Sequence, residues 1–342
     1  MLKIALTITA AAVLSASAFC SQVLEADRAE EKNLILLKNA HAVVGVLPHA
    51  GGRVVLYRLV DGANVLHSDP AKWTEAPESA PSPEAFYQFY NGHTCWVSPQ
   101  SQWWTQQDVN TARRDAKAVW PPDPYLELSP CRIIKQTKTE LRIELPKSPI
   151  CGLTLIKSVR LNDDGSVSLS VKGTNARKSS VAWGLWSNTR LPGTMTCYVP
   201  LNLDTEAATS IRIEGNLTGE IRDRFFFFQA KDVSTKGKYG KAFIQNPTGG
   251  MFAFGKNLCF VKSVQPAGSK EVHPSQAPVE IYQNIDPHPN AQLLELENHG
   301  EYERLNSGES ISIEETWQLL HYAGPADFAS HIRFMRETKL PK

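Results

Sequence analysis

The sequence lacks the short motifs that mark several large classes of enzyme. It contains no G-x-S-x-G nucleophile elbow, no H-E-x-x-H zinc motif and no glycine-rich phosphate loop that leads into a helix. It also has almost no excess charge, because 36 lysines and arginines balance 35 aspartates and glutamates, which leaves a net charge of +1. This balance argues against nucleic acid as a partner and against adhesion to anionic membranes, since both depend on an excess of basic residues.

Cysteines are few and widely spaced, and no C-x-x-C pair occurs. This spacing argues against a structural zinc site, and no oxygen-rich loop of the kind that binds calcium is present, so no metal or other cofactor is predicted. After Cys20 the number of cysteines is odd, which leaves one disulfide or a set of buried free thiols as open alternatives. These cysteines are Cys95, Cys131, Cys151, Cys197 and Cys259.

The N-terminal residues 1–22 predict a signal peptide, because a positively charged start precedes an apolar stretch, Ile4 to Leu14, that is too short to span a bilayer. Residues 23–30 read as a charged leader. We therefore expect an exported protein, in the periplasm or outside the cell. Lipid anchoring at Cys20 is the less favoured alternative, because Phe19 is a poor residue directly before a lipidated cysteine. No later segment is apolar enough to predict a membrane span, and nothing indicates the oligomeric state.

Short runs of β-branched and aromatic residues, separated by Gly, Pro, Asn and Asp, dominate the rest of the chain. Alternation in segments such as TELRIELP and SVSLSVKG predicts antiparallel strands with one buried face. So many strands normally divide into two packed sheets. We therefore expect an all-β fold with one domain over residues 31–322, followed by a helical tail over residues 323–342 whose helix runs from Pro325 to Glu337.

Two segments near the C-terminal end place acidic residues on the face opposite apolar ones. In LLELEN, Glu295 and Glu297 share one face of a strand, while Leu294 and Leu296 share the other. In VEIYQN, Glu280 is separated from its apolar neighbours in the same way. A carboxylate in a partly desolvated cleft has a raised pKa and can serve as a general base. The alternative is a solvated sheet face whose charges point outward.

Residues 68–129 interrupt the strand pattern with Pro, Ser, Gln and five of the eight tryptophans. A loop of this length inside a compact domain is typically functional. Aromatic rings stack on the apolar faces of sugars, while polar side chains fix the sugar through hydrogen bonds. The alternative is an aromatic cluster that only holds the loop against the domain. The predicted sugar contacts of this segment are His93, Trp96, Gln100, Trp104, Trp120 and Asp123.

The basic run STKGKYGK contains Lys236, Lys238 and Lys241. We expect Lys238 to neutralise an acidic ligand such as a uronic acid. The alternative is a solvated loop, in which lysines are common.

The segments GVLPHAGGRVVLYRLVDGANVLH and LLELENHGEYERLNSGESISIEETWQLL resemble the opening hairpin and the last strands of the galactose mutarotase-like superfamily. In the middle of the chain, GHTCWVSPQ followed by WPPDP resembles an uncharacterised bacterial branch of that superfamily (DUF4380-like). The resemblance covers most of the mature chain and implies a supersandwich of two large antiparallel sheets with sugar bound on a concave face. The matching positions are Gly51, Gly52, Arg53, Gly62, Asn64, Leu66, Leu305, Gly308, Glu309, Glu315 and Trp317.

The resemblance also implies roles for single residues. Aldose 1-epimerases of that superfamily use a glutamate on a late strand as general base, and Glu297 is the best match, with Glu295 second. They use a histidine on a middle strand as general acid, but this chain has no histidine in the corresponding VAWGLWSNTRLPG. Arg190 is the nearest polar residue there, and arginine cannot release a proton at useful pH. His93 matches a histidine that contacts substrate.

Three functions follow from these features. The first is an exported carbohydrate-binding protein that holds a sugar or oligosaccharide with Trp, His and Glu side chains. The second is an aldose 1-epimerase-type mutarotase with Glu297 as base, in which His93 or Tyr282 supplies the missing acid. The third is a polysaccharide lyase or hydrolase, in which Glu297 acts with Arg190 or Lys238 on a charged sugar.

Overall fold

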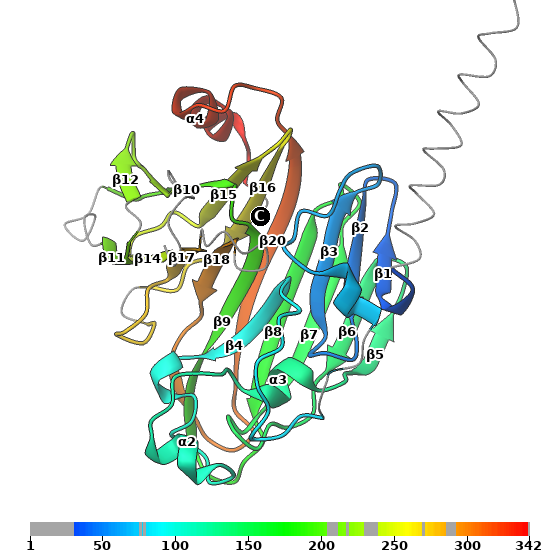
Figure 1. Cartoon of the computed structure of the whole chain (residues 1–342), viewed down its shortest axis with the longest axis vertical. Helices are drawn as coiled ribbons and strands as arrows, with labels where there is room; N and C mark the ends of the chain where they lie inside the picture. The colour runs from blue at the N-terminus through cyan, green and yellow to red at the C-terminus, as the bar shows by residue number, and fades with distance from the viewer. Residues whose placement is uncertain are drawn as a thin grey trace, which may run out of the picture.

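The computed structural model describes residues 31–74, 77, 80–203, 211–216, 219–228, 239–268, 271–284 and 292–340. The predicted signal peptide, the charged leader and Lys238 lie outside these residues. Within them, most of the chain folds into two ten-stranded antiparallel sheets, as the alternating pattern predicts (Figure 1). No helix in the described part of the chain is long and apolar enough to cross a membrane.

The first sheet runs in the order β1-β2-β3-β4-β9-β18-β17-β14-β11, and β19 pairs with β9 beside this path. Strand β18 therefore lies between β9 and β17, which brings together segments that are about a hundred residues apart in the chain. The strands are β1 (Ile35–Lys38), β2 (Ala42–Leu47), β3 (Arg53–Leu59), β4 (His93–Ser98), β9 (Val181–Pro192), β11 (Ile211–Gly215), β14 (Tyr239–Ile244), β17 (Val279–Asn284), β18 (Leu293–His299) and β19 (Glu303–Leu305).

The second sheet runs in the order β12-β13-β10-β15-β16-β20-β8-β7-β6-β5. A tight turn at Asn162 to Gly165 joins β7 to β8, and the Gly165 amide donates to the Asn162 carbonyl. The strands are β5 (Arg132–Gln136), β6 (Glu140–Glu144), β7 (Leu153–Leu161), β8 (Val167–Asn175), β10 (Thr196–Pro200), β12 (Gly219–Arg222), β13 (Phe225–Phe228), β15 (Gly250–Gly255), β16 (Leu258–Val264) and β20 (Ser310–His321).

The core lies between the two sheets. Leu294 and Leu296 of β18 are fully buried there in one cluster with Phe260 and Trp317 of the second sheet. Because side chains alternate along a strand, the face of the first sheet that points away from this core carries Glu295 and Glu297. The same alternation therefore separates the apolar core from the polar face that forms the candidate site.

Helices are short, apart from the predicted C-terminal one. They are η1 (Glu31–Asn33), η2 (Pro70–Thr74), η3 (Gln100–Gln102), α2 (Thr111–Asp115), α3 (Pro124–Leu128) and α4 (Phe328–Glu337). Helix α4 starts later than Pro325, because the side chain of Asp327 caps its first turn by accepting a hydrogen bond from the Ser330 amide. Figure 1 shows α4 at one end of the molecule and α2 at the other.

The turn between β2 and β3 ties the long segment of residues 68–129 to the first sheet. Gly51 adopts a φ of 73°, and a Cβ there would lie 2.5 Å from the carbonyl oxygen of Leu126, so the turn requires glycine. The Gly51 amide donates to the Ser129 carbonyl, and Arg53 pairs with Glu127 at 2.9 Å. The C-terminal end of α3 is thereby fixed against the hairpin.

The five described cysteines are all free thiols. Four of them are buried, and burial raises the pKa of the Cys95 thiol to about 12. The sequence leaves open either one disulfide or a set of buried free thiols, and among the described residues the structure has free thiols, four of them buried.

Candidate functional site

A cavity of about 580 Å³ lies on the face of the first sheet that points away from the core. Strands of the sheet form its floor, and the aromatic segment of residues 68–129 forms a wall over it. This volume lies in the range of small-molecule sites in proteins. The lining residues are Lys72, Tyr87, Phe89, Asn91, Trp96, Gln100, Trp103, Trp120, Trp186, Arg190, Lys241, Tyr282, Asn284, Leu293, Glu295 and Glu297.

Cross-strand pairing sets the polar floor of the cavity. Glu297 of β18 lies opposite Glu280 of β17, and Glu295 lies opposite Tyr282 of β17 and Arg190 of β9. Side chains directly opposite each other on one face of an antiparallel pair are close enough to interact. The floor therefore consists of two neighbouring rows of polar side chains, and the alternation in LLELEN and VEIYQN predicts the face on which they lie.

In the first row, Lys241 of β14 joins the two buried carboxylates. Its ammonium lies 2.7 Å from Glu280 Oε2 and 2.7 Å from Glu297 Oε2. Burial alone would lower the pKa of Lys241, but the two carboxylates raise it, so the ammonium stays charged. Burial raises the pKa of Glu297, and the neighbouring carboxylates Glu295 and Glu280 raise it further. At Glu280 the effect of burial is outweighed by Lys241 and His299, which lower the pKa of that carboxyl group. The row thus holds one ionised carboxylate and one that is poised to take a proton.

In the second row, Arg190 Nε pairs with Glu295 Oε1 at 2.8 Å. The Arg190 guanidinium also lies over the ring of Trp96, 5.0 Å from its centroid. Burial alone would lower the pKa of Arg190, but Tyr87 and Glu295 raise it. Arg190 is therefore a permanent cation inside the cavity.

Tryptophan side chains form the back of the cavity and are held in fixed orientations. Trp186 stacks on Trp103 with ring centroids 5.8 Å apart and donates its Nε1 hydrogen to Glu297 Oε2 at 3.0 Å. Trp96 donates its Nε1 hydrogen to Glu127 Oε1 at 2.8 Å. At the rim, Trp120 is 48% exposed, so part of its ring faces solvent at the cavity mouth. Rigid aromatic faces of this kind are suited to stacking against an apolar ligand surface.

Four residues that line this cavity each have a buried polar atom without a hydrogen-bond partner among the described residues. These atoms are Tyr87 Oη, Asn91 Oδ1, Arg190 Nη1 and Glu297 Oε1. Buried polar groups in folded proteins are nearly always paired, so a cluster of unpaired ones indicates a place where a ligand or water completes the bonds. The four atoms include both donors and acceptors.

Of the residues predicted from the sequence, the structure brings seven together at the cavity. Glu280 lies directly behind them, where it contacts Lys241 without lining the cavity. The seven are Glu295, Glu297, Tyr282, Trp96, Gln100, Trp120 and Arg190.

Three predicted residues lie elsewhere. His93 is on the opposite face of β4 from Trp96, where its ring contacts Trp317 in the core, so it cannot contact a ligand in the cavity. Trp104 is fully buried, and its Nε1 donates to the Pro121 carbonyl. Asp123 is buried and caps α3 through the Tyr125 amide. Trp104 and Asp123 therefore hold the segment of residues 68–129 in place. For these two residues the structure matches the alternative in which the segment is only held against the domain.

The sequence prediction missed several cavity residues. Lys241 was considered only as part of the basic run, whereas it is the cation that bridges the two glutamates. Trp186 stands two residues before Asn188 in the strand of Arg190, so the same alternation that puts Arg190 in the cavity puts Trp186 there. Tyr87 and Asn91 lie in irregular structure, where no periodic signal marks the side-chain direction.

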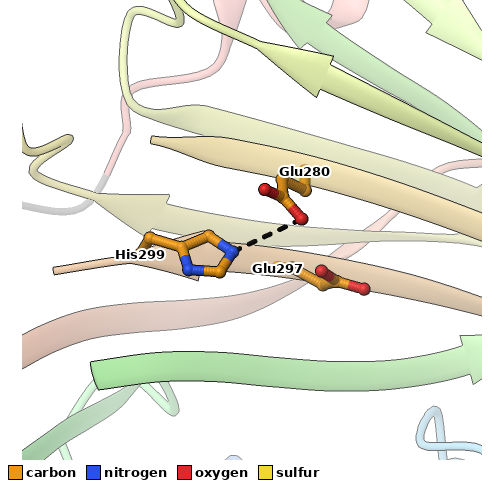
Figure 2. Close-up of side chains that lie close together, drawn as sticks. All are labelled: Glu280, Glu297 and His299. Carbon is orange, nitrogen blue, oxygen red and sulfur yellow. Dashed lines mark ion pairs between the residues drawn. The ribbon is translucent and has the colours of Figure 1, made fainter. Parts of the chain in front are cut away.

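Glu280, Glu297 and His299 could together hold a cation, because their ligand atoms lie within 4.8 Å of one another (Figure 2). In the structure, however, the Lys241 ammonium already lies between the two carboxylates. A divalent ion would have to displace this ammonium or sit beside it, and both arrangements are unfavourable in a buried site. We therefore treat Lys241 as the cation of the cluster.

The sequence over residues 33–320 matches the family described as domain of unknown function (DUF4380). Among curated protein sequences none matches the chain. Several solved structures share its fold, including the following three. A galactose mutarotase-like protein from Lactobacillus casei has a TM-score of 0.52 at 10% identity, over 84% of this chain and 100% of that one. The Slr1438 protein from Synechocystis has a TM-score of 0.51 at 15% identity, over 84% and 96%.

The third is a TPR-domain containing protein from Parabacteroides distasonis, with a TM-score of 0.54 at 13% identity, over 90% of this chain and 49% of that one. Identities this low show a common fold and carry no information on activity. The family match and the two-sheet architecture together confirm the resemblance found in the sequence. The chain therefore belongs to the DUF4380 family, and its fold is galactose mutarotase-like.

Proposed function

We propose that the cavity on the first sheet binds a carbohydrate. The observation that carries the proposal is the set of four unpaired polar atoms, Tyr87 Oη, Asn91 Oδ1, Arg190 Nη1 and Glu297 Oε1, in a cavity walled by tryptophan. A sugar ring offers apolar C–H faces for the indoles and hydroxyl groups that both donate and accept hydrogen bonds. A purely apolar ligand would leave all four atoms unpaired, at a cost of about 1–3 kcal/mol each.

The likeness to a galactose mutarotase-like protein supports the same ligand class, although it shows the fold alone. The N-terminal sequence supports export, so the ligand we propose is a sugar or oligosaccharide met outside the cytoplasm. A lyase or hydrolase has no specific observation in its favour, because Arg190 and Lys241 already pair with the two cavity carboxylates.

A second candidate, an aldose 1-epimerase-type activity, is favoured by the state of Glu297. This carboxylate has one oxygen bonded to Lys241 and Trp186 and the other unpaired, and its burial raises its pKa. A base of this kind could remove the proton of an anomeric hydroxyl group. The proton donor toward the ring oxygen would have to be a cavity residue other than His93, such as Tyr87 or Tyr282, because His93 does not line the cavity.

Sugar binding can be followed by intrinsic fluorescence, because Trp96, Trp103, Trp120 and Trp186 line the cavity. We expect a saturable change with at least one of glucose, galactose, glucuronate, galacturonate and their disaccharides. Trp96→Ala should weaken binding about tenfold through the loss of one aromatic face. The matched control is Trp104→Phe, which changes a buried indole of the same segment outside the cavity and should leave the affinity unchanged. No saturable change with any of these sugars would contradict the proposal.

The second candidate is tested by polarimetry on freshly dissolved α-glucose and α-galactose. Acceleration by the wild-type protein, lost in Glu297→Gln, would establish Glu297 as a base. Saturable sugar binding without faster anomer interconversion would support the binding function and exclude the epimerase activity.

A further inference from the structure

Five aromatic side chains of the cavity form a continuous series of ring contacts. Trp186 packs on Trp103 with ring centroids 5.8 Å apart, and Trp103 packs on Trp120 at 6.4 Å. Trp120 contacts Tyr87 at 5.0 Å, and Tyr87 contacts Phe89 at 5.0 Å. All five residues line the cavity. The aromatic wall is therefore one connected surface and not a set of separate side chains.

The exposure of these rings rises along the series. Trp103 and Trp186 are 1% and 3% exposed, whereas Trp120 is 48% and Phe89 is 56% exposed. Tyr87, which joins the inner rings to the outermost one, is half-buried. The aromatic wall thus runs from the closed floor of the cavity to the solvent at its mouth. A ligand confined to the buried part would leave much of Trp120 and Phe89 in water.

Trp120 is held in place although it is exposed. Gln100 Nε2 donates a hydrogen bond to the Val119 carbonyl at 2.9 Å, and Trp104 Nε1 donates to the Pro121 carbonyl at 2.8 Å. Side chains of the same segment therefore fix the backbone on both sides of Trp120. Single exposed apolar side chains are common on protein surfaces, but a connected apolar surface that opens from a ligand cavity indicates a binding surface.

We propose that the ligand of this site is an oligosaccharide that is longer than the cavity, with one sugar unit at the polar floor and the following units on Trp120 and Phe89. The inference rests on the proposed sugar binding and makes its ligand class specific. Arg190 and Glu295 on the floor offer polar groups to the hydroxyl groups of the first unit. The outer rings offer apolar faces on which the C–H faces of the later units stack.

Other occupants fit the outer rings less well. A nucleic acid also stacks on aromatic rings, but it needs an excess of basic residues, and this chain has a net charge of +1. A stable interface with a second copy of the chain or with another protein buries about 1,200–2,000 Å² in total. Two half-exposed aromatic side chains, at about 150–250 Å² each when fully buried, supply only a small part of that area. An oligosaccharide needs neither condition, and its first unit belongs to the ligand class proposed for the cavity.

Isothermal titration calorimetry with sugars of increasing length tests the proposal. The probes are fragments of cellulose, amylose and polygalacturonate, each from the monosaccharide to the pentasaccharide. In at least one series we expect the affinity to rise about tenfold from the monosaccharide to the trisaccharide, because the added units stack on the outer rings. Trp120→Ala should lose most of this gain, while its affinity for the monosaccharide stays within about twofold of wild type.

Phe89→Ala is the second variant, because it removes the outermost ring and leaves the hydrogen bonds beside Trp120 in place. It should lose part of the gain with chain length. The matched control is Ile133→Ala on β5, at the edge of the other sheet. Ile133 is 46% exposed, so it is an apolar side chain of similar exposure away from the cavity, and every affinity should remain unchanged.

A gain with chain length that is lost in Trp120→Ala and reduced in Phe89→Ala would establish the extended site. Equal affinities for the monosaccharide and all longer fragments, or a gain that both variants retain, would overturn the inference and leave the proposed sugar binding intact. No binding of any fragment would overturn both. A dimer in sedimentation velocity that dissociates in Phe89→Ala would show that a second copy covers these rings, which also overturns the inference. If Trp120→Ala does not fold, Phe89→Ala decides.

Discussion

Replacing Lys241 by methionine should destabilise the protein strongly and in a pH-dependent manner. The change keeps the length of the side chain but removes the ammonium that lies 2.7 Å from each of two fully buried carboxylates. Removing one partner of a buried ion pair typically costs about 3–5 kcal/mol, because the remaining charge has no compensation. We expect a loss of this size in the free energy of unfolding at pH 8.

The pH dependence follows from Glu297. Its pKa in the folded protein is already raised by burial, and loss of Lys241 would raise it further. A carboxyl group whose pKa is higher in the folded than in the unfolded state destabilises the fold increasingly as pH rises above its unfolded value, which is about 4.3. At pH 5 the group in the variant carries its proton at little cost, so the loss of stability should be distinctly smaller than at pH 8.

Urea denaturation followed by tryptophan fluorescence at pH 5 and pH 8 measures both quantities. The matched control is Lys135→Met, which removes an exposed ion pair with Glu140 and should leave the free energy of unfolding nearly unchanged at either pH. The double variant Lys241→Met with Glu297→Gln should recover part of the loss at pH 8. A loss below about 1 kcal/mol in Lys241→Met, equal at both pH values, would refute the assigned role of the ammonium.

Two further predictions concern the buried side chains of His93 and Glu127. His93→Gln should leave sugar affinity within about twofold of wild type, because His93 lies in the core, where burial lowers its pKa to about 3 and keeps it neutral; a tenfold loss in titrations would contradict this placement. Glu127→Gln should cost about 3–5 kcal/mol at pH 7, since it leaves the Arg53 guanidinium unpaired. Burial alone would raise the pKa of Glu127, but Arg53 lowers it, so this stabilisation is present above about pH 4.3 and is lost as pH falls. Denaturation curves at pH 7 and pH 3 that show the same deficit would exclude this account.

Strand periodicity in the sequence was sufficient to predict which residues form the central part of the candidate site. The alternation in LLELEN places Glu295 and Glu297 on one face and Leu294 and Leu296 on the other, and the structure has this arrangement. A period of two is a local property, so it can be seen without knowing the neighbouring strands. The all-β architecture is predictable for the same reason.

The cation of the site was not predictable in this way. Lys241 reaches Glu280 and Glu297 only because β14 pairs with β17 and β17 with β18. These pairings join segments whose order in the chain says nothing of their register, so the basic run offered several lysines without a means of choosing one. Lys238, the residue chosen from the sequence, lies outside the described residues.

The error at His93 has a different origin. His93 and Trp96 are three residues apart, so they point to opposite faces of any strand that contains both. The sequence predicts both residues at one sugar site because residues 68–129 lack a clear strand pattern, and in a loop alternation does not assign side chains to faces. Recognition of β4 within that segment would have assigned the tryptophan to the cavity and the histidine to the core.

The attachment of the aromatic wall to the β2–β3 turn would affect the thermodynamics of the proposed sugar binding. Gly51 donates to Ser129, and Arg53 holds Glu127, which in turn orients the Trp96 indole. The side chains that would stack on a ligand are therefore ordered before it arrives, and each ordered side chain saves about 0.5–1.5 kcal/mol of conformational entropy on association. A preorganised wall of this kind favours rapid, nearly rigid docking, in which specificity comes from the fixed spacing of the indoles and not from closure of a loop.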